Sequence, residues 1–265
     1  MFPHKSLLWL AIPLFALAGL SSCTKKEGCT DPNALNYDAS AEKDCCCEYA
    51  TTFDLELHLH GYVGANALLE GNTYTINGVD TRLDLVQFYV SNIRVVDASG
   101  TEFPAENYLL VNPEVNGYDA GAVEAGSYTA LRFDIGIDSL TNHADPSVYP
   151  ANDPLGPQFP PMHWSWDAGY IFIRIDGMAD QDLNGTPETA FEMHVGKDAN
   201  RVAVEIPYEF SAEAGDAFTF HLNVNWNNFF DGVDMTGDIT THTSDNLDLT
   251  SILVNNINGM FSLEE

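Results

Sequence analysis

The sequence predicts a mainly β protein: an antiparallel β-sandwich, immunoglobulin-like or barrel-like, with few short helices. Three observations support this fold class. One segment alternates strictly between apolar and polar residues, many short apolar segments are separated by glycine-containing turns, and helical periodicity is scarce. Strands with one buried face alternate in this way. Many short strands within about 215 residues favour a single sandwich or barrel.

The clearest strand is residues 53–60, in which four apolar residues alternate with Asp54, Glu56, His58 and His60. Turn signals such as Asn-Gly, Ser-Gly and Ala-Gly separate the later segments and mark the ends of strands. These further predicted strands are residues 83–96, 108–111, 128–137, 170–175, 191–195, 202–206 and 218–224.

Two segments depart from the strand pattern. Residues 246–257 are the best helical candidate, and residues 138–162 are rich in Pro, Asn and Asp without any periodicity. Long loops inside compact domains are uncommon and are often functional. We therefore expect the loop at 138–162 to lead to a site.

The N-terminus predicts export. Residues 7–20 are an apolar run that is too short for a membrane span and typical of a signal peptide, which we place at residues 1–22. The segment Leu20-Ser21-Ser22-Cys23 resembles the bacterial lipobox, so Cys23 is the expected lipidation site; the alternative is an ordinary signal peptide with a chance cysteine. We expect a lipid-anchored protein of the cell envelope, in the outer membrane, on its periplasmic or its surface side.

The remaining four cysteines all lie in residues 23–50, which we interpret as a lipid-anchored Cys-rich linker before a β domain at residues 51–265. Cysteines in an oxidising compartment tend to form disulfides. Cys29 is expected to pair with Cys45, Cys46 or Cys47. The segment also resembles a short Gly-Cys-Thr-Asp-Pro repeat of secreted Bacteroidetes proteins.

The composition argues for a folded, acidic domain. Hydrophobic residues make up 45% of the chain, and 39 acidic against 10 basic residues give a net charge of −29. Apolar content of this size supports a real core. The negative charge repels nucleic acid, so we expect no nucleic-acid partner.

Potential metal ligands and indoles gather in the block Met162-His163-Trp164-Ser165-Trp166. Imidazole is a good ligand for copper, zinc or nickel, and thioether adds affinity for Cu(I). A tryptophan pair by itself is more often core packing or a sugar-stacking platform.

Several motifs follow one another along the chain. They are Asn77-Gly-Val-Asp80, Phe88-Tyr-Val-Ser-Asn92, Gly126-Ser-Tyr128, Phe133-Asp-Ile-Gly-Ile-Asp138, Asn142, the tryptophan block through Tyr170, and Phe191-Glu-Met-His194-Val-Gly196. In this order and spacing they resemble the copper-binding MbnP-like family of methanotrophs and Bacteroidetes lipoproteins.

The resemblance implies a β protein that holds copper through histidines, helped by a tryptophan oxidised to kynurenine. Opening the indole ring creates an amine beside a carbonyl, which supplies nitrogen and oxygen donors. Trp164 is the candidate for oxidation, with Trp166 as the alternative. His194 matches the family's His-x-Gly position, although a solvent-facing histidine is the alternative reading. The resemblance also implies a dihaem peroxidase-like partner and an outer-membrane importer.

Two further histidines complete the predicted ligand set of His194, His163, His60 and Trp164. His163 lies in the tryptophan block, where it is either an added ligand or a tolerated variant. His60 is favoured slightly over His58, which shares its strand face about 7 Å away; a polar outer face is the alternative. His221 is expected to be merely exposed, and His143 and His242 lie in loops without a readable partner.

A calcium site is suggested by Asp180, Asp182 and Asn184, which fit the opening of an EF-hand-like loop. The twelfth position of that loop is Phe191 instead of Glu, and strands flank it. An acidic hairpin turn is therefore the favoured alternative.

The family resemblance and the N-terminus together imply a copper-binding lipoprotein that captures or handles the metal outside the cytoplasm. No nucleophile elbow, phosphate loop or zinc-protease helix is present, so we predict a binding protein and not an enzyme. The alternative is a surface adhesion or glycan-binding module that uses Trp164, Trp166 and Tyr170 for stacking.

Overall fold

The computed structural model describes residues 25–165 and 168–264. The chain divides into two compact units, Met1–Tyr49 and Ala50–Glu265. The predicted signal peptide, Cys23 and Trp166, the alternative candidate for oxidation, lie outside the described residues. In the part of the chain that is described, no helix has the length and apolar character needed to cross a membrane.

The N-terminal unit is a small turn-rich segment closed by a disulfide. Its strands β1 (Glu27–Gly28) and β2 (Lys43–Asp44) pair in parallel. Of the three partners that the sequence left open for Cys29, the structure selects Cys47. Among the described cysteines, Cys45 and Cys46 are free.

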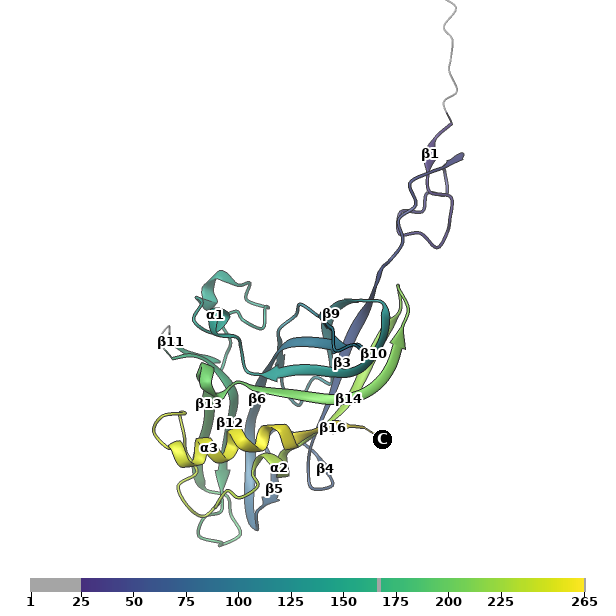
Figure 1. Cartoon of the computed structure of the whole chain (residues 1–265). Coiled ribbons are helices and arrows are strands. Elements are labelled where there is room, and N and C mark those ends of the chain that lie inside the picture. The colour runs from purple at the N-terminus through teal and green to yellow at the C-terminus, as the bar shows by residue number, and fades with distance from the viewer. Residues whose placement is uncertain (1–24, 166–167, 265) are drawn as a thin grey trace, which may run out of the picture. The chain divides into compact units, whose positions relative to one another are not determined.

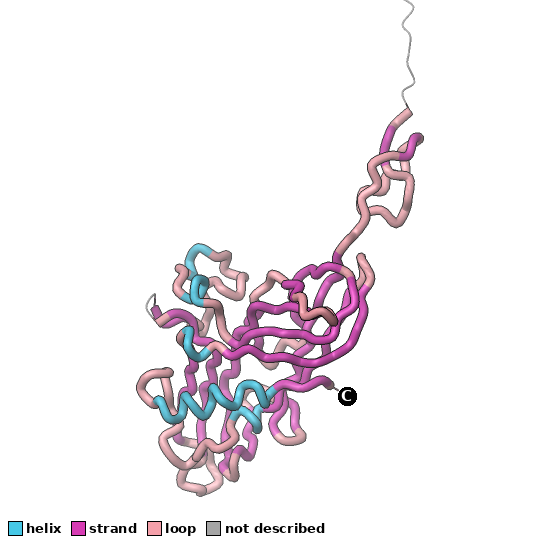
Figure 2. The backbone as a smooth tube through the Cα atoms, in the orientation of Figure 1, coloured by secondary structure: helices cyan, strands magenta, loops and turns pink. Residues whose placement is uncertain are grey.

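The second unit is built from two β-sheets with few short helices (Figures 1 and 2). The nine-stranded sheet has the order β11 (His163–Ser165), β12 (Gly169–Ala179), β6 (Val79–Val96), β10 (Gly126–Ile135), β14 (Val202–Ala212). In addition, β13 (Thr189–Gly196) pairs with β12. Three short strands pair with β6, namely β5 (Asn72–Ile76), β7 (Glu102–Pro104) and β8 (Leu109–Val111). The five-stranded sheet has the order β16 (Phe261–Leu263), β15 (Ala217–Asn225), β3 (Thr52–Val63), β4 (Asn66–Ala67), with β9 (Gly117–Glu124) on β3.

Among the described strands of this unit, all pairs but one are antiparallel. β3 and β15 run parallel, with His58 opposite His221. The predicted mainly antiparallel β-sandwich with few short helices is confirmed.

The core lies between the two sheets. From the five-stranded sheet, Leu55, Leu57 and Leu59 of β3 are at most 4% exposed, as the alternation of residues 53–60 predicts. From the other sheet, β12 and β13 contribute Ile173, Ile175, Phe191, Met193 and Val195 to the same cluster. The intervening residues of all these strands therefore face outward, away from the shared core.

Every predicted strand falls within an observed strand or overlaps one, and the predicted helix is confirmed as α3 (Leu247–Asn256). Asn246 caps α3, because its side chain accepts a hydrogen bond from Leu249 N. The other helical elements are α1 (Ser139–Asn142), α2 (Trp226–Phe229), η1 (Pro146–Val148), η2 (Asp198–Asn200) and η3 (Ile257–Met260).

The loop at 138–162 is ordered by contacts with the outer face of the nine-stranded sheet. It contains α1 and η1, and it covers a second, smaller apolar cluster. Its members are Tyr89, Ile137, Leu155, Met162, Tyr170, Ile171 and Phe172, against which Trp164 packs.

Candidate metal centre

His194 lies on β13 with its side chain on the outer face of the nine-stranded sheet, yet it is only 4% exposed. Its Nε2 lies 2.6 Å from Asp176 Oδ1. Its Nδ1 is buried and has no hydrogen-bond partner among the described residues. The alternative of a solvent-facing histidine is therefore wrong, because covering segments bury the ring.

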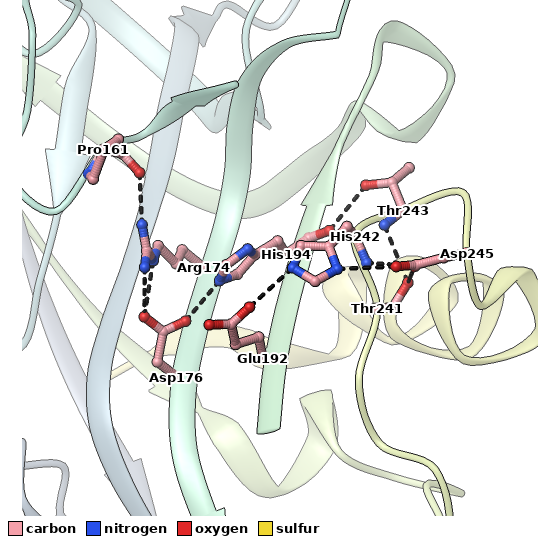
Figure 3. A network of polar contacts seen from close by, with 9 residues as sticks. All are labelled: Pro161, Arg174, Asp176, Glu192, His194, Thr241, His242, Thr243 and Asp245. Carbon is pink, nitrogen blue, oxygen red and sulfur yellow. Dashed lines mark hydrogen bonds and ion pairs between the residues drawn. The ribbon is translucent and has the colours of Figure 1, made fainter. Parts of the chain in front are cut away.

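Asp176 lies on the neighbouring strand β12 and fixes the orientation of this ring (Figure 3). Arg174 donates to Asp176 Oδ2 from Nε (3.0 Å) and Nη2 (2.7 Å). Burial opposes ionisation of Asp176, but the hydrogen bonds from His194 and Arg174 outweigh it and lower its pKa. An ionised Asp176 accepts a hydrogen bond from Nε2–H, and this tautomer leaves the lone pair on His194 Nδ1, an arrangement typical of metal-binding histidines.

His242 approaches His194 from the loop before α3, and the two rings lie 5.0 Å apart. Its Nδ1 lies 2.9 Å from Asp245 Oδ2, and its Nε2 lies 2.9 Å from Glu192 Oε2. The hydrogen bond to Asp245, followed by the one to Glu192, raises the pKa of His242 against the effect of burial.

Backbone pairing holds the His242 loop against the free edge of β13. Thr241 O accepts from His194 N, and Thr241 N donates to Glu192 O, both at 2.8 Å. Thr243 Oγ1 accepts from Gly196 N at 2.8 Å and donates to His194 O at 2.9 Å. His242 thus joins the site through β-type contacts between distant segments.

Glu192, His194 and His242 each offer one ligand atom, and these atoms lie within 4.8 Å of one another. A tetrahedral ion with bonds of about 2.1 Å separates its ligands by about 3.4 Å. Small side-chain movements would therefore bring the three donors around one ion. Two imidazoles with a carboxylate suit copper or zinc.

Trp164 of β11 lies next to this group. A Cβ atom added to Gly196 would lie 2.6 Å from Trp164 Cζ3, so the indole ring rests directly on this glycine. Residues two apart on a strand share a face. The structure therefore brings Trp164 and His194 onto the same face of β13, and the Gly of the His-x-Gly motif makes room for the indole.

His163 does not belong to the group around His194. Its ring packs edge-on against Tyr170 at 4.8 Å, and its Nε2 is buried without a hydrogen-bond partner among the described residues. Burial lowers the pKa of His163, against the opposing effect of Asp145. The register of β11 against β12 shifts between His163 and Ser165, at the position of Trp164.

His60 lies on β3 of the other sheet, where it groups with His58 and His221 instead of His194. The sequence combined His60 and His194 in one ligand set because both face outward from a strand. The structure places them on different sheets, each facing away from the shared core. His221, expected to be merely exposed, is a member of the second group.

The sequence analysis did not identify His242 and Glu192 as candidate ligands. Nothing in the sequence pairs His242 with His194, because the contact depends on how the loop before α3 folds back along β13. Glu192 carried a weak signal, since it alternates with His194 and so shares its face.

Asn142, at the end of α1, fixes the start of β12. It is fully buried, its Oδ1 accepts from Tyr170 N, and its Nδ2 donates to Asp198 Oδ1, both at 2.7 Å. Tyr170 itself is 1% exposed and donates its hydroxyl to Leu155 O. Tyr170 is therefore not available as part of a sugar-stacking surface.

The suggested calcium loop is the hairpin between β12 and β13. Asp180 accepts backbone hydrogen bonds from Asn184 (2.9 Å) and Gly185 (2.7 Å), one on each carboxylate oxygen. Asp182 accepts from the side chain of Asn184 at 3.0 Å. These contacts fit the acidic hairpin turn, and calcium binding by this loop stays a prediction.

Comparison with known proteins supports the family resemblance. The family model of MbnP matches residues 52–247. Among solved structures, MbnP from Methylosinus trichosporium matches with a TM-score of 0.53 and 17% sequence identity, covering 75% of this chain and 87% of that chain. At this identity the match shows a shared fold. A search of curated proteins finds no match.

Proposed function

The chain belongs to the MbnP family, and from this premise we propose that it binds copper through His194 and His242. Glu192 supplies a neighbouring carboxylate. Trp164, once oxidised to kynurenine, is the auxiliary ligand. Copper is the cargo of the protein, which captures it outside the cytoplasm and passes it to an outer-membrane importer.

The observation that carries this proposal is the buried Nδ1 of His194, which has no hydrogen-bond partner among the described residues. A buried polar atom without a partner costs about 1–3 kcal/mol. A metal ligand atom accounts for this cost, because the bound ion takes the lone pair. Asp176 forms a hydrogen bond with the other ring nitrogen of His194, Nε2. Asp245 likewise forms a hydrogen bond with Nδ1 of His242.

Trp164 supports the family's tryptophan chemistry at this site. Its ring lies on Gly196, on the strand face that carries His194. Oxidation of the indole would place an amine and a carbonyl close to the two imidazoles. We propose that a dihaem peroxidase-like partner performs this oxidation and that Cys23 carries the lipid anchor.

The test is metal content and intact mass of protein purified from its native host grown with copper. Each variant described below also carries His58→Ala and His221→Ala, so that the histidines on the five-stranded sheet cannot contribute to the copper content. We expect bound copper and a kynurenine mass shift at Trp164. His194→Ala and His242→Ala should lose the copper, whereas the matched control His143→Ala should keep it.

Two results would overturn the proposal. One is protein from copper-fed native cells that holds no copper and carries an unmodified Trp164. The other is full copper content in both the His194→Ala and the His242→Ala proteins.

A further inference from the structure

Three of the chain's eight histidines converge at one point on the five-stranded sheet, away from the site described above. His58 and His60 share a face of β3 because they are two residues apart, and His221 lies directly opposite His58 on β15. Their neighbours Leu57, Leu59, Phe220 and Leu222 point the other way, into the core. The three imidazoles therefore lie on the outer face.

The rings are close enough to share one ion. Ring centroids are 4.8 Å apart for His58 and His221, 6.1 Å for His60 and His221, and 6.3 Å for His58 and His60. One nitrogen from each ring lies within 4.8 Å of the other two. The backbone register of two paired strands sets this arrangement, so it does not depend on a mobile loop.

A carboxylate completes the group. Glu264 Oε2 lies 2.9 Å from His60 Nδ1 and 3.7 Å from His221 Nδ1. Its backbone N donates to His221 O at 3.0 Å, which holds Glu264 beside the imidazoles. A second carboxylate oxygen, on Glu56, lies 3.8 Å from His58 Nε2.

The neighbouring strand leaves room for this group. Gly117 of β9 pairs with His58, and a Cβ atom added to Gly117 would lie 3.0 Å from His58 Nε2. The side chains of His58, His60 and His221 are 33%, 35% and 51% exposed, so an ion can reach them from solvent.

From this juxtaposition we propose that His58, His60 and His221, with Glu264, form a second metal site for a divalent late first-row ion such as Zn²⁺. Three imidazoles and a carboxylate match the donors and four-coordinate geometry that zinc prefers, and imidazole also suits Cu²⁺ and Ni²⁺. The site is open to solvent, in contrast to the buried His194. This inference is independent of the copper proposal.

The test is calorimetric titration of Zn²⁺ into the full-length mature protein carrying His194→Ala and His242→Ala. This background removes the first site, so failure of the copper proposal cannot affect the result. We expect one equivalent of Zn²⁺ to bind. Each of His58→Ala, His60→Ala and His221→Ala should weaken binding by more than about tenfold, since even removal of an outer-shell partner costs 10–100-fold. The exposed control His143→Ala should not.

Gly117→Ala provides a variant that keeps every ligand. Its new methyl group crowds His58 Nε2 and should weaken Zn²⁺ binding, while circular dichroism shows an unchanged fold. The proposal is overturned if the background protein binds no Zn²⁺, or if combined loss of His58 and His221 leaves the affinity unchanged.

Discussion

Asp176 shows how a single side chain can orient a candidate metal ligand. It lies one strand away from His194, carries the charge that Arg174 stabilises, and accepts a hydrogen bond from Nε2–H. The consequence is a buried imidazole with one nitrogen already oriented and the other left available. Outer-shell carboxylates of this kind fix the tautomer and raise the basicity of the ligand.

Removing the negative charge of Asp176 while keeping the shape of its side chain tests whether it orients His194. We expect Asp176→Asn to lower copper affinity about 10–100-fold, because a neutral amide holds the imidazole less firmly. Competition against a copper chelator measures the change. The control is Asp84→Asn, an exposed carboxylate paired with Arg82. Equal affinity in Asp176→Asn and the control would contradict the assigned role.

At the scale of elements, the site depends on where β11 and β12 meet. Asn142 at the end of α1 binds both the first residues of β12 and Asp198 of η2. Asp138 begins α1 as its N-cap, accepting hydrogen bonds from Leu140 N and Thr141 N, and also accepts one from Tyr108. A short helix thereby fixes the start of β12, the strand with which β11 and its Trp164 pair.

Removing the Asn142 side chain should loosen this junction. We expect Asn142→Ala to lower the free energy of unfolding by about 1–3 kcal/mol, because Tyr170 N loses its buried acceptor. Urea denaturation measures the stability, and tryptophan fluorescence of the native protein reports on the surroundings of the indoles. The neighbouring variant His143→Ala serves as control. Unchanged stability would show that the contact contributes little.

The strands that the sequence revealed are those with an internal apolar pattern. β3 is the clearest, since each of its inward residues is apolar. The sequence analysis did not predict β4, β5, β7, β9, β11 and β16 of the second unit, because these strands are short or irregular. β9, for example, contains Gly121 at φ +108° and has a register shift against β3. The loop at 138–162 appeared structureless because its order comes from distant tyrosines, such as Tyr89 donating to Pro154 O.

Only part of the candidate site could be predicted, namely the residues that lie in family motifs or whose strand face follows from alternation. His194 and Trp164 were found through the family motifs. Alternation showed that His60 faces outward, but periodicity cannot tell which sheet a strand joins. His60 was therefore combined with the wrong partner, and His242 was missed because its loop adopts its position only in the folded protein.

At the scale of the whole molecule, the cysteines and the core lie in different units. The described disulfide joins Cys29 and Cys47 within the N-terminal unit, whereas the buried cluster runs from Phe53 to Phe261 in the second unit. No cysteine occurs after Cys47 in the sequence. The stability of the β domain should therefore not depend on the redox state of the chain.

This expectation can be checked by thermal unfolding with and without a thiol reductant. The melting temperature of the β domain should not change on reduction, nor on removal of residues 1–49. The positive control is Phe53→Ala, which truncates a core residue that is 1% exposed. This variant should lower the free energy of unfolding by about 3–5 kcal/mol. A lower melting temperature on reduction would show that the N-terminal unit stabilises the domain.

The parallel pairing of β3 with β15 also affects how the domain acquires its structure. The first long strand of the domain needs a partner that follows much later in the chain, so the five-stranded sheet cannot be completed until β15 (Ala217–Asn225) has been synthesised. Closing so long a loop is entropically costly, and domains rich in such contacts fold in about milliseconds to seconds. Until β15 is available, one edge of β3 keeps unpaired backbone groups, and such an edge is prone to aggregation.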